Sequence, residues 1–465
     1  MPEIIESLPV TLSTLSPLHI GMGERLGGLD FVWEGRSISV VDQKKLAARL
    51  AANQGLADAY IRLCETDHPR IGDFLREHHV PPRDLAAYSL PAKGHMAAAV
   101  IPFIKGANGR PFVPGSSVKG AIRSALLRSA VMQDETLRDA VANAADTESR
   151  RVERRVRPGR PAKMSHSSGV VDHGCFGPDQ QHDVMRVLGF ADSRTLEFSD
   201  FMIADVRVLS VRGTSLGIKQ TPRSREMVLP CEVVAPGSTV RLRLTRLDHL
   251  LTDEKAVKEL GFSTKAELIH RWTTRCNQVA LWAAEHELEF YHCYGESRLA
   301  RWYEETLLPV IRGARENECV LHFAWGAGFE AMTVTNLLPV EQSRMIRTRL
   351  ALGKGEPFPK SRKVVFQDDE PWMPLGWVLL PCGEGQGRVR EASSVGGRLG
   401  EMWDIIGLRE VQPKVGMESI KKLQERLGRQ TPEDRPSSKK AKGSERAKAE
   451  QERIRRKISG EDEMK

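Results

Sequence analysis

Apolar and polar residues alternate along several stretches of this chain, and the alternation predicts β-strands. Residues 10–21 alternate through VTLSTL and then break at Pro17, as expected of a strand that runs into a loop. Residues 31–42 predict a hairpin with its turn near Gly35. Other strands are predicted at 198–213, 225–247, 318–326 and 374–381. The stretch 225–247 holds two strands that share a turn at Pro236-Gly237.

A period near 3.6 residues marks the helical parts of the chain. Composition and spacing predict helices at 43–64 and 71–80, through most of 250–313, and in the apolar second half of 111–130. Strands and helices mix without a regular strand–helix–strand period. The sequence therefore predicts an α+β fold, with helices on one face of antiparallel sheets.

Two polar segments interrupt this pattern and concentrate positive charge. Residues 131–169 are polar and arginine-rich and predict an exposed, mobile insertion. Within them, residues 150–163 hold seven Lys or Arg against one Glu, a local charge of +6. The tail from about residue 428 predicts disorder or a solvated single helix, and residues 432–457 hold ten Lys or Arg against five Asp or Glu. Such a concentration of positive charge favours an anionic partner, and nucleic acid is the leading candidate. The alternative is a basic surface that only contacts solvent.

Length and composition narrow the class of protein further. The chain has 465 residues and a formal net charge of +8, enough length for two to four domains. No apolar run approaches the ~18 residues of a membrane span. The opening MPEIIESLPVTL lacks the basic and apolar regions of a signal peptide. Seven cysteines without a CxxC pair predict reduced thiols, so we expect a cytoplasmic protein with no membrane partner.

The stretch PFVPGSSVKGAIRSALLRSA, residues 111–130, begins a helix abruptly and places cations near its start. Ser116 or Ser117 is expected to cap the helix, and the first amides then offer a seat for a phosphate. Lys119 and Arg123 are four residues apart and share one face. A cation near the start of a helix interacts unfavourably with the helix dipole, at a cost of ~0.3–1 kcal/mol each. An anion bound beside the cations would offset that cost. A phosphate site and an ordinary capped core helix with solvated cations both remain open.

A glycine-rich loop with a histidine is a second candidate site. In PLHIGMGE, residues 17–24, His19 precedes Gly21 and Gly23. His19 could act as a general base in RNA cleavage or hold the loop by a hydrogen bond. The structural role is favoured because no second acid–base candidate is near it in sequence.

Two further segments combine glycine, aromatic and basic residues. HFAWGAGFEAMT, residues 322–333, contains Trp325, which offers a stacking face within a glycine-rich loop. The segment 352–365 follows and contributes Lys360, Arg362 and Lys363. A polar loop at 212–226 predicts a basic hairpin for a nucleic-acid backbone, or only an exposed hairpin tip. Its cations are Arg212, Lys219, Arg223 and Arg225.

Residues 166–183 hold possible metal ligands of the kind that zinc prefers. They are His166, His173, Cys175 and His182. Their spacings are not those of a zinc finger or a zinc protease. No phosphate-binding loop, serine-hydrolase elbow or other convincing nucleophile constellation is present, so we expect neither a metal nor another cofactor.

Taken together, these pieces resemble the RAMP proteins of type III CRISPR effector complexes. The resemblance rests on TLSPLHIGMGE at 14–24, PFVPGSSVKGAIRSALL at 111–127 and the two late glycine-rich segments. Within that superfamily, the chain is most similar to the Csm subunit that caps the crRNA 3′ end in type III-A complexes. DVMRVLGFADS at 183–193, GAGFEAMT, FPKSRKVV and PLGWVLL follow in that subunit's order. The resemblance covers roughly residues 8–382.

This resemblance implies a fold of two ferredoxin-like (RRM-like) RAMP domains in tandem, with helical insertions. We expect an N-terminal RAMP domain at 1–247 with the arginine-rich insertion, a C-terminal RAMP domain at 248–411 and a charged tail at 412–465. The implied role is a non-catalytic subunit that binds crRNA. Its implied partners are the backbone RAMP subunit, the small helical subunit, target RNA and host nucleases that trim the crRNA 3′ end.

The resemblance also assigns residues to RNA. Ser116, Ser117, Lys119 and Arg123 would meet crRNA phosphates, and His19, Gly21 and Gly23 would form the adjoining loop. Gly326, Gly328, Lys360 and Arg362 would form a C-terminal surface that faces RNA. Two alternatives remain: a RAMP endoribonuclease that processes crRNA precursor with His19 as its base, and the equivalent RAMP subunit of a type III-B complex. The stretch 150–163 and the tail after 427 have no counterpart in the resemblance.

Overall fold

The fold is described from a computed structural model of the chain. The structure describes residues 6–92, 98–153, 167–222, 225–349, 352 and 357–382. The chain divides into two units, residues 1–413 and 414–465, and the second lies outside the described residues, as does the predicted tail. Everything below therefore concerns the first unit.

A five-stranded antiparallel sheet organises this unit, in the order β10-β13-β1-β9-β5. Its strands are β1 (Glu6–Thr14), β5 (Leu188–Ala191), β9 (Thr239–Arg246), β10 (Glu318–His322) and β13 (Trp377–Pro381). Strand β9 shows why the sheet has one buried face: Val240, Leu242 and Leu244 are buried, while Arg241 and Arg243 between them are exposed.

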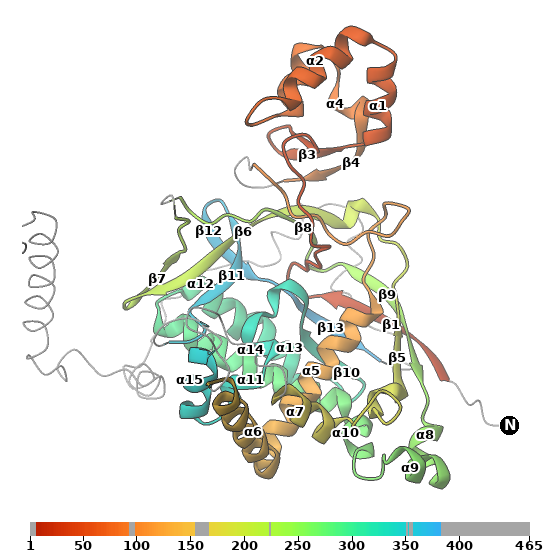
Figure 1. Ribbon diagram of the computed structural model, residues 1–465, viewed down its shortest axis with the longest axis vertical. Helices are drawn as coiled ribbons and strands as arrows, with labels where there is room; N and C mark the ends of the chain where they lie inside the picture. Colours follow the sequence, from red (N-terminus) through yellow and green to blue (C-terminus); the bar gives the residue numbers. More distant parts are fainter. Residues whose placement is uncertain are drawn as a thin grey trace, which may run out of the picture. The chain divides into compact units, whose positions relative to one another are not determined.

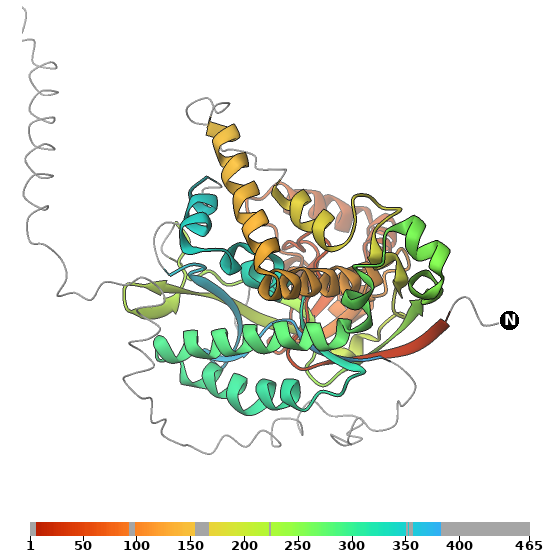
Figure 2. The ribbon, with the colours of Figure 1, turned by 90° about the horizontal axis from the view of Figure 1, so that it is seen from below.

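Two long helices, α5 (Gly115–Gln133) and α11 (Trp272–Cys293), contact each other and this sheet (Figures 1 and 2). Without the inserted elements, the chain order is β1, α5, β5, β9, α11, β13. That is the β-α-β-β-α-β order of a ferredoxin-like unit, with β13 and β9 flanking β1. Strand β13 comes from beyond residue 247, so the sheet joins parts of both predicted domains. The division into 1–247 and 248–411 stays a prediction.

A second sheet has the order β12-β11-β6-β7, and β8 pairs with β6 beside this path. Its strands are β6 (Phe201–Arg212), β7 (Ser215–Ile218), β8 (Cys231–Val234), β11 (Ser361–Gln367) and β12 (Glu370–Pro374). The expected turn at Pro236-Gly237 is present, with Gly237 at φ 79°. It joins β8 to β9, as predicted, but these strands pair with different neighbours: β8 pairs with β6, while β9 pairs with β1 and β5.

Between β1 and α5 the chain inserts a segment with its own core. A three-stranded sheet of β2 (Phe31–Trp33), β3 (Ser37–Val41) and β4 (Ala86–Pro91) confirms the predicted hairpin at 31–42. The predicted helix at 43–64 is two helices, because the Asn53 side chain accepts a hydrogen bond from Leu56 N and starts a new one. The helices are α1 (Gln43–Ala51), α2 (Gln54–Cys64), α3 (Ile71–Glu77) and α4 (Pro82–Leu85).

The helical stretch predicted at 250–313 is confirmed, and the exposed insertion predicted at 131–169 is partly wrong. Residues 135–153 form a helix whose Val141, Ala142 and Ala145 are buried. Residues 154–166, which include most of the arginine-rich stretch, lie outside the described residues. The other α-helices are α6 (Glu135–Glu153), α7 (Ser167–Cys175), α8 (His249–Thr252), α9 (Glu254–Leu260), α10 (Ala266–His270), α12 (Ser297–Arg301), α13 (Leu308–Arg312), α14 (Gly328–Met332) and α15 (Val340–Arg349). Short η-helices are η1 (Val184–Val187), η2 (Phe198–Asp200), η3 (Trp302–Leu307), η4 (Ala324–Gly326) and η5 (Thr335–Leu337).

Helices and sheets thus form an α+β fold, as predicted. Within the described ranges, no helix combines the length and the apolar character needed to cross a membrane.

Candidate nucleic-acid interface

The start of α5 is capped by a residue far away in the sequence. The helix begins at Gly115 with Pro114 at the N-cap, and no side chain of the N-cap residue bonds to it. Instead, the Asp192 carboxylate accepts a hydrogen bond of 2.8 Å from Gly115 N, and Ser193 Oγ accepts one of 2.9 Å from Val113 N. The expected cap by Ser116 or Ser117 is therefore wrong. A carboxylate of the protein itself already lies where the helix dipole favours negative charge.

Gly115 is required at this position by packing. A Cβ atom there would lie 2.1 Å from Phe190 O, a backbone atom that cannot move aside easily. The helix start thus sits directly against the end of β5, which explains the abrupt Pro-Gly beginning. Ser116 is exposed and Ser117 is partly buried in the first turn.

Arg123 has a side chain that is 33% exposed and pairs with two carboxylates of the protein itself. Its Nη1 lies 2.6 Å from Asp183 Oδ2, and its Nη2 lies 3.2 Å from Asp172 Oδ1. The guanidinium also stacks 4.0 Å from the ring centroid of Phe176. Lys119 is partly buried, and this burial lowers its pKa. The negative charge of Asp183 acts in the other direction but does not cancel the effect. Lys119 and Arg123 are thus both partly buried, and the role of either residue in binding phosphate stays a prediction.

The structure brings the two predicted glycine-rich loops together around His19. The His19 ring is 1% exposed, and its Nδ1 lies 2.7 Å from Glu232 O. Its ring centroid is 5.1 Å from that of Trp325, edge to face, and Trp325 N donates a hydrogen bond of 3.2 Å to His19 O. Burial lowers the pKa of His19, so the ring is neutral at neutral pH. These contacts agree with the structural role that was favoured for His19.

The second loop approaches the sheet through a glycine. A Cβ atom on Gly326 would lie 2.1 Å from Leu375 O, so only glycine fits there. Gly23 in the first loop and Gly328 in the second have φ values of +86° and +64°, which a glycine adopts at little cost. Gly21 pairs with Phe103 in an isolated β-bridge.

Neighbouring cations of β11 point to opposite faces of their sheet. Lys363 Nζ lies 4.8 Å from the Trp325 ring centroid and donates a hydrogen bond of 3.2 Å to Trp325 O. Arg362 points the other way, where its Nε lies 2.7 and 2.8 Å from the two carboxylate oxygens of Glu287. Burial lowers the pKa of Lys363, whereas the carboxylate of Glu287 helps to keep Arg362 charged. We call residues 19–23, residues 324–328 and Lys363 the loop junction.

The basic hairpin is present and exposed. Strands β6 and β7 pair up to Arg212 and Ser215, and Arg212, Lys219 and Arg225 are exposed. Arg223 lies outside the described residues. Lys360 is partly buried and lies beside the same strand, because its carbonyl oxygen accepts a hydrogen bond of 2.9 Å from Val211 N.

The possible metal ligands do not gather. His182 Nδ1 lies 2.7 Å from Asp179 Oδ1, and Cys175 is buried, which raises its pKa to about 11. His173 lies on α7, and His166 lies outside the described residues. In the ranges that the structure describes, no three His, Cys, Asp or Glu side chains are placed to hold a metal ion.

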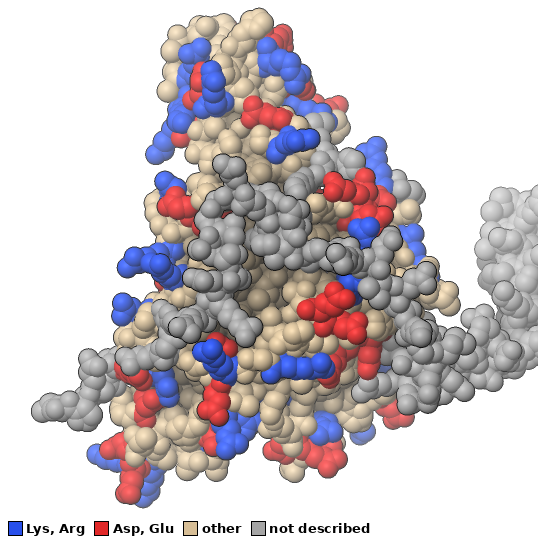
Figure 3. Space-filling view, turned by 180° about the vertical axis from the view of Figure 1, so that it is seen from behind, with Lys and Arg blue, Asp and Glu red and all other residues tan. Residues whose placement is uncertain are grey.

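Sequence reasoning missed two exposed cations, Arg241 and Arg243, which lie on the open face of β9. Their signal was the alternation in TVRLRLTR, which was interpreted only as a strand. On the face seen in Figure 3, Lys and Arg are interspersed with Asp and Glu over the coloured surface and do not form one continuous patch.

Two named proteins are similar in sequence to parts of this chain. A protein of Streptococcus thermophilus named "CRISPR system Cms protein Csm5" is 30% identical over 144 residues, which are 28% of this chain and 40% of the relative. The match thus spans less than half of that relative's length. A protein of the same name from Mycobacterium tuberculosis (strain CDC 1551 / Oshkosh) is 26% identical over 275 residues, 52% of this chain and 67% of the relative.

Two solved structures share the fold. A chain in "Cryo-EM structure of Csm-crRNA-target RNA ternary complex in type III-A CRISPR-Cas system" aligns with a TM-score of 0.59 at 23% identity, covering 81% of this chain and 100% of that one. "Crystal structure of T.onnurineus Csm5" aligns with a TM-score of 0.54 at 22% identity, covering 79% and 99%. The sequence model of the RAMP superfamily matches residues 11–307, which hold the end of β1, α5, β6 of the second sheet and most of the helical stretch. On that match, this chain belongs to the RAMP superfamily.

Proposed function

We propose that this chain is the crRNA-binding subunit of a type III-A Csm complex that caps the crRNA 3′ region and supports complex assembly and crRNA maturation in antiviral defence. Two relatives carry the name Csm5, and one structure with the same fold comes from a complex with crRNA and target RNA. The proposed partners are crRNA, target RNA, the backbone RAMP subunit and the small helical subunit. Host nucleases for 3′ trimming and a cytoplasmic location stay predictions.

The observation that carries the proposal is the loop junction. Two glycine-rich segments more than 300 residues apart meet at His19 and Trp325, through a backbone hydrogen bond and a ring contact. Glycines let backbone amides approach phosphates closely, and a cation beside an aromatic face suits a nucleotide. Lys363 over Trp325 supplies that combination.

Within the predicted RNA-binding set, ion pairs with carboxylates of the protein separate supporting residues from direct contacts. Arg123 and Arg362 are tied to carboxylates of the protein, so we assign them to support of α5 and β11. The residues proposed for direct RNA contact are partly or fully exposed: Gly21, Gly23, Ser116, Ser117, Lys119, Arg212, Lys219, Arg225, Trp325, Gly326, Gly328, Lys360 and Lys363.

We propose that the subunit is not a nuclease. A general base must reach the proton that it removes. His19 is buried, and its Nδ1 is already hydrogen-bonded to the backbone oxygen of Glu232. The alternative, in which this chain cleaves crRNA precursor, is distinguished by the experiment below. The type III-B alternative is another, since it predicts different partners for the same fold.

The test is co-purification from cells that carry a whole type III-A operon, with a tag on this chain and sequencing of the bound RNA. Mature crRNA should co-elute with backbone subunits, and deleting this chain should remove or shorten the crRNA 3′ end. Free chain that cuts repeat RNA at a fixed position, with loss of cleavage in His19→Ala, would establish the nuclease instead. Assembly only with type III-B subunits would establish that alternative.

A charge-reversal pair tests the basic hairpin against a matched control. Lys219→Glu with Arg225→Glu should lower crRNA retention and reduce the dependence of log K on log salt by about one per lost phosphate contact. Lys255→Glu with Lys258→Glu makes the same charge change on exposed residues of α9 and should leave retention unchanged. Equal retention in both pairs would remove the hairpin from the interface.

A further inference from the structure

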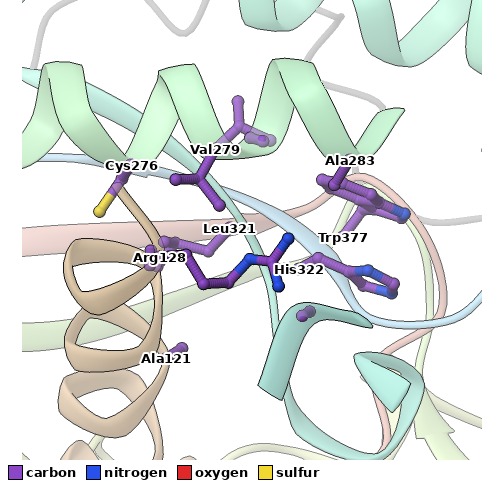
Figure 4. Close-up of a pocket in the computed structure, with 12 residues that line it drawn as sticks. Ala121, Arg128, Cys276, Val279, Ala283, Leu321, His322 and Trp377 are labelled. Atoms are coloured by element: carbon purple, nitrogen blue, oxygen red, sulfur yellow. The ribbon is translucent and has the colours of Figure 1, made fainter. Parts of the chain in front are cut away.

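Helices α5 and α11 cover one face of the five-stranded sheet. Leu242 of β9 lies in the same core cluster as Ile122 of α5 and Val279 of α11. Figure 4 shows Val279, together with Arg128 of α5 and Leu321 of β10, around the small space that remains on this face, which measures about 30 Å³. Because one water needs roughly 10–15 Å³, that space holds about two waters and excludes a nucleotide. A large ligand can reach the sheet only from its opposite face.

The opposite face is open over β1, β9 and β5. Over β10 and β13 it is closed, because Val320 and Trp377 are buried in a core that includes Ile311 of α13. The pairing registers of β1, β9 and β5 place ten residues on the open part, and all of them are partly or fully exposed. We call these residues the open sheet face: Ser7, Pro9, Thr11, Ser13, Gly189, Ala191, Thr239, Arg241, Arg243 and Thr245. None of them is acidic or aromatic, and five carry a hydroxyl group.

Two arginines of the open sheet face carry charge without a counter-ion. Arg241 and Arg243 are both exposed, and residues two apart along a strand point to the same side, about 6.8 Å from each other. Arg243 Nη1 donates a hydrogen bond of 3.0 Å to Ser7 Oγ, a neutral group. Arg194 is a third exposed cation beside them, since its backbone N donates a hydrogen bond of 3.4 Å to Arg241 O. In the part of the chain that the structure describes, none of these arginines forms an ion pair with a carboxylate.

We infer that the open sheet face binds the phosphates of a single-stranded RNA segment, as a site separate from the loop junction. The inference rests on the proposed function, which makes RNA a ligand of this chain. Two guanidinium groups at this spacing along one strand can meet successive phosphates of an extended nucleic acid, and the hydroxyl groups around them are further donors to phosphate oxygens. The face has no aromatic ring on which a base could stack, so the contact is independent of RNA sequence.

The composition and position of this face favour a nucleic acid over a protein partner. The centre of a protein–protein interface is enriched in aromatic side chains, whereas surfaces that bind nucleic acid are more polar and more positively charged. The face also continues from the loop junction. Strand β1 leads into residues 19–23, and β9 follows β8, whose Glu232 O lies 2.7 Å from His19 Nδ1. One RNA strand can therefore run from the loop junction along β9.

The experiment measures binding of the full chain to single-stranded RNA as a function of salt, with oligouridylate and a mixed-sequence RNA of equal length as probes. Arg241→Gln with Arg243→Gln should reduce the slope of log K against log salt by about 1.4, which is about 0.7 for each lost phosphate contact. Counted from ~1 M salt, this change of slope corresponds to a loss of about 25-fold in affinity at ~0.1 M salt. Both probes should lose affinity equally, because no base is read.

Two further pairs of variants separate this site from a general charge effect. Arg241→Lys with Arg243→Lys keeps both charges and should retain most of the wild-type slope. Arg76→Gln with Arg83→Gln removes two cations of the inserted segment that are 79% and 88% exposed, and it should bind RNA like wild type. All three pairs should unfold at the wild-type urea midpoint, because every changed side chain is exposed.

The outcomes distinguish this inference from the proposed function. A wild-type slope in Arg241→Gln with Arg243→Gln, when Lys219→Glu with Arg225→Glu lowers the slope, would overturn the inference and leave the proposed function standing. Unchanged RNA affinity with loss of assembly onto backbone subunits would also overturn it, by assigning the face to a protein. A wild-type chain without salt-dependent RNA affinity would overturn the proposed function itself.

Discussion

Glu232 of β8 ties three segments together, and its removal is the most direct test of the packing described above. Its carboxylate accepts hydrogen bonds from Tyr88 of the inserted segment at 2.5 Å, from Phe103 N at 2.8 Å and from Lys105 Nζ at 2.5 Å. Its backbone carbonyl oxygen holds His19. We predict that Glu232→Gln destabilises the chain severely while it keeps nearly the same volume.

The magnitude follows from the donors around the carboxylate. Three donor groups converge on two oxygens, but glutamine offers one oxygen and an NH₂ group. The amide oxygen can still accept from Phe103 N and Lys105 Nζ, and the NH₂ group can donate to the Tyr88 hydroxyl, but Lys105, whose side chain is only 12% exposed, loses its counter-charge. Breaking a buried pair by removing one partner costs about 3–5 kcal/mol. That is a large share of the ~5–15 kcal/mol by which folded proteins are usually stable.

The assay is urea unfolding of the full chain, compared with a surface control. Glu259→Gln removes a carboxylate that is 66% exposed and 3.9 Å from Lys255, and it should change the free energy of unfolding by at most about 0.5 kcal/mol. Adding Lys105→Met to Glu232→Gln should cost less than the sum of the single changes, since the buried ammonium is gone. A loss below about 1 kcal/mol for Glu232→Gln would refute the reasoning.

Two further predictions concern α5 and β10. Gly115→Ala should cost about 1–3 kcal/mol in urea unfolding, because its Cβ would lie 2.1 Å from Phe190 O. Gly120→Ala on the same helix meets nothing within 4 Å and should gain about 0.5–1 kcal/mol, so equal effects of the two would contradict the close packing of the helix start. Burial lowers the pKa of His322 to about 4, below the roughly 6.5 of an exposed ring, so the unfolded chain takes up this proton first as pH falls. The resulting stability is present above pH 6.5 and is lost between about 6.5 and 4. His322→Phe should flatten the wild-type fall of the urea midpoint in that window, and an unchanged slope would show that another group titrates.

Local pattern alone was enough for much of the fold. Alternation at 10–21 and 31–42 predicted β1 and the β2–β3 hairpin, and the apolar period predicted α5 and the helices after 250. These elements follow from which side of a strand or helix is apolar, a property of neighbours in sequence. The order of the motifs around PGSSVKGAIR likewise indicated the RAMP superfamily, because such motifs are short runs of neighbouring residues.

The partners of individual side chains were decided only by tertiary structure. The cap of α5 comes from Asp192, 77 residues from Gly115, so the nearby serines were a misleading signal. Arg362 and Lys363 are neighbours in a basic run, yet β11 directs one into Glu287 and the other onto Trp325. The counter-charges of Arg123 come from residues 49 and 60 positions away. Sequence period determines which face a residue occupies, but burial and pairing depend on what the fold brings to that face, and distant contacts leave no local pattern.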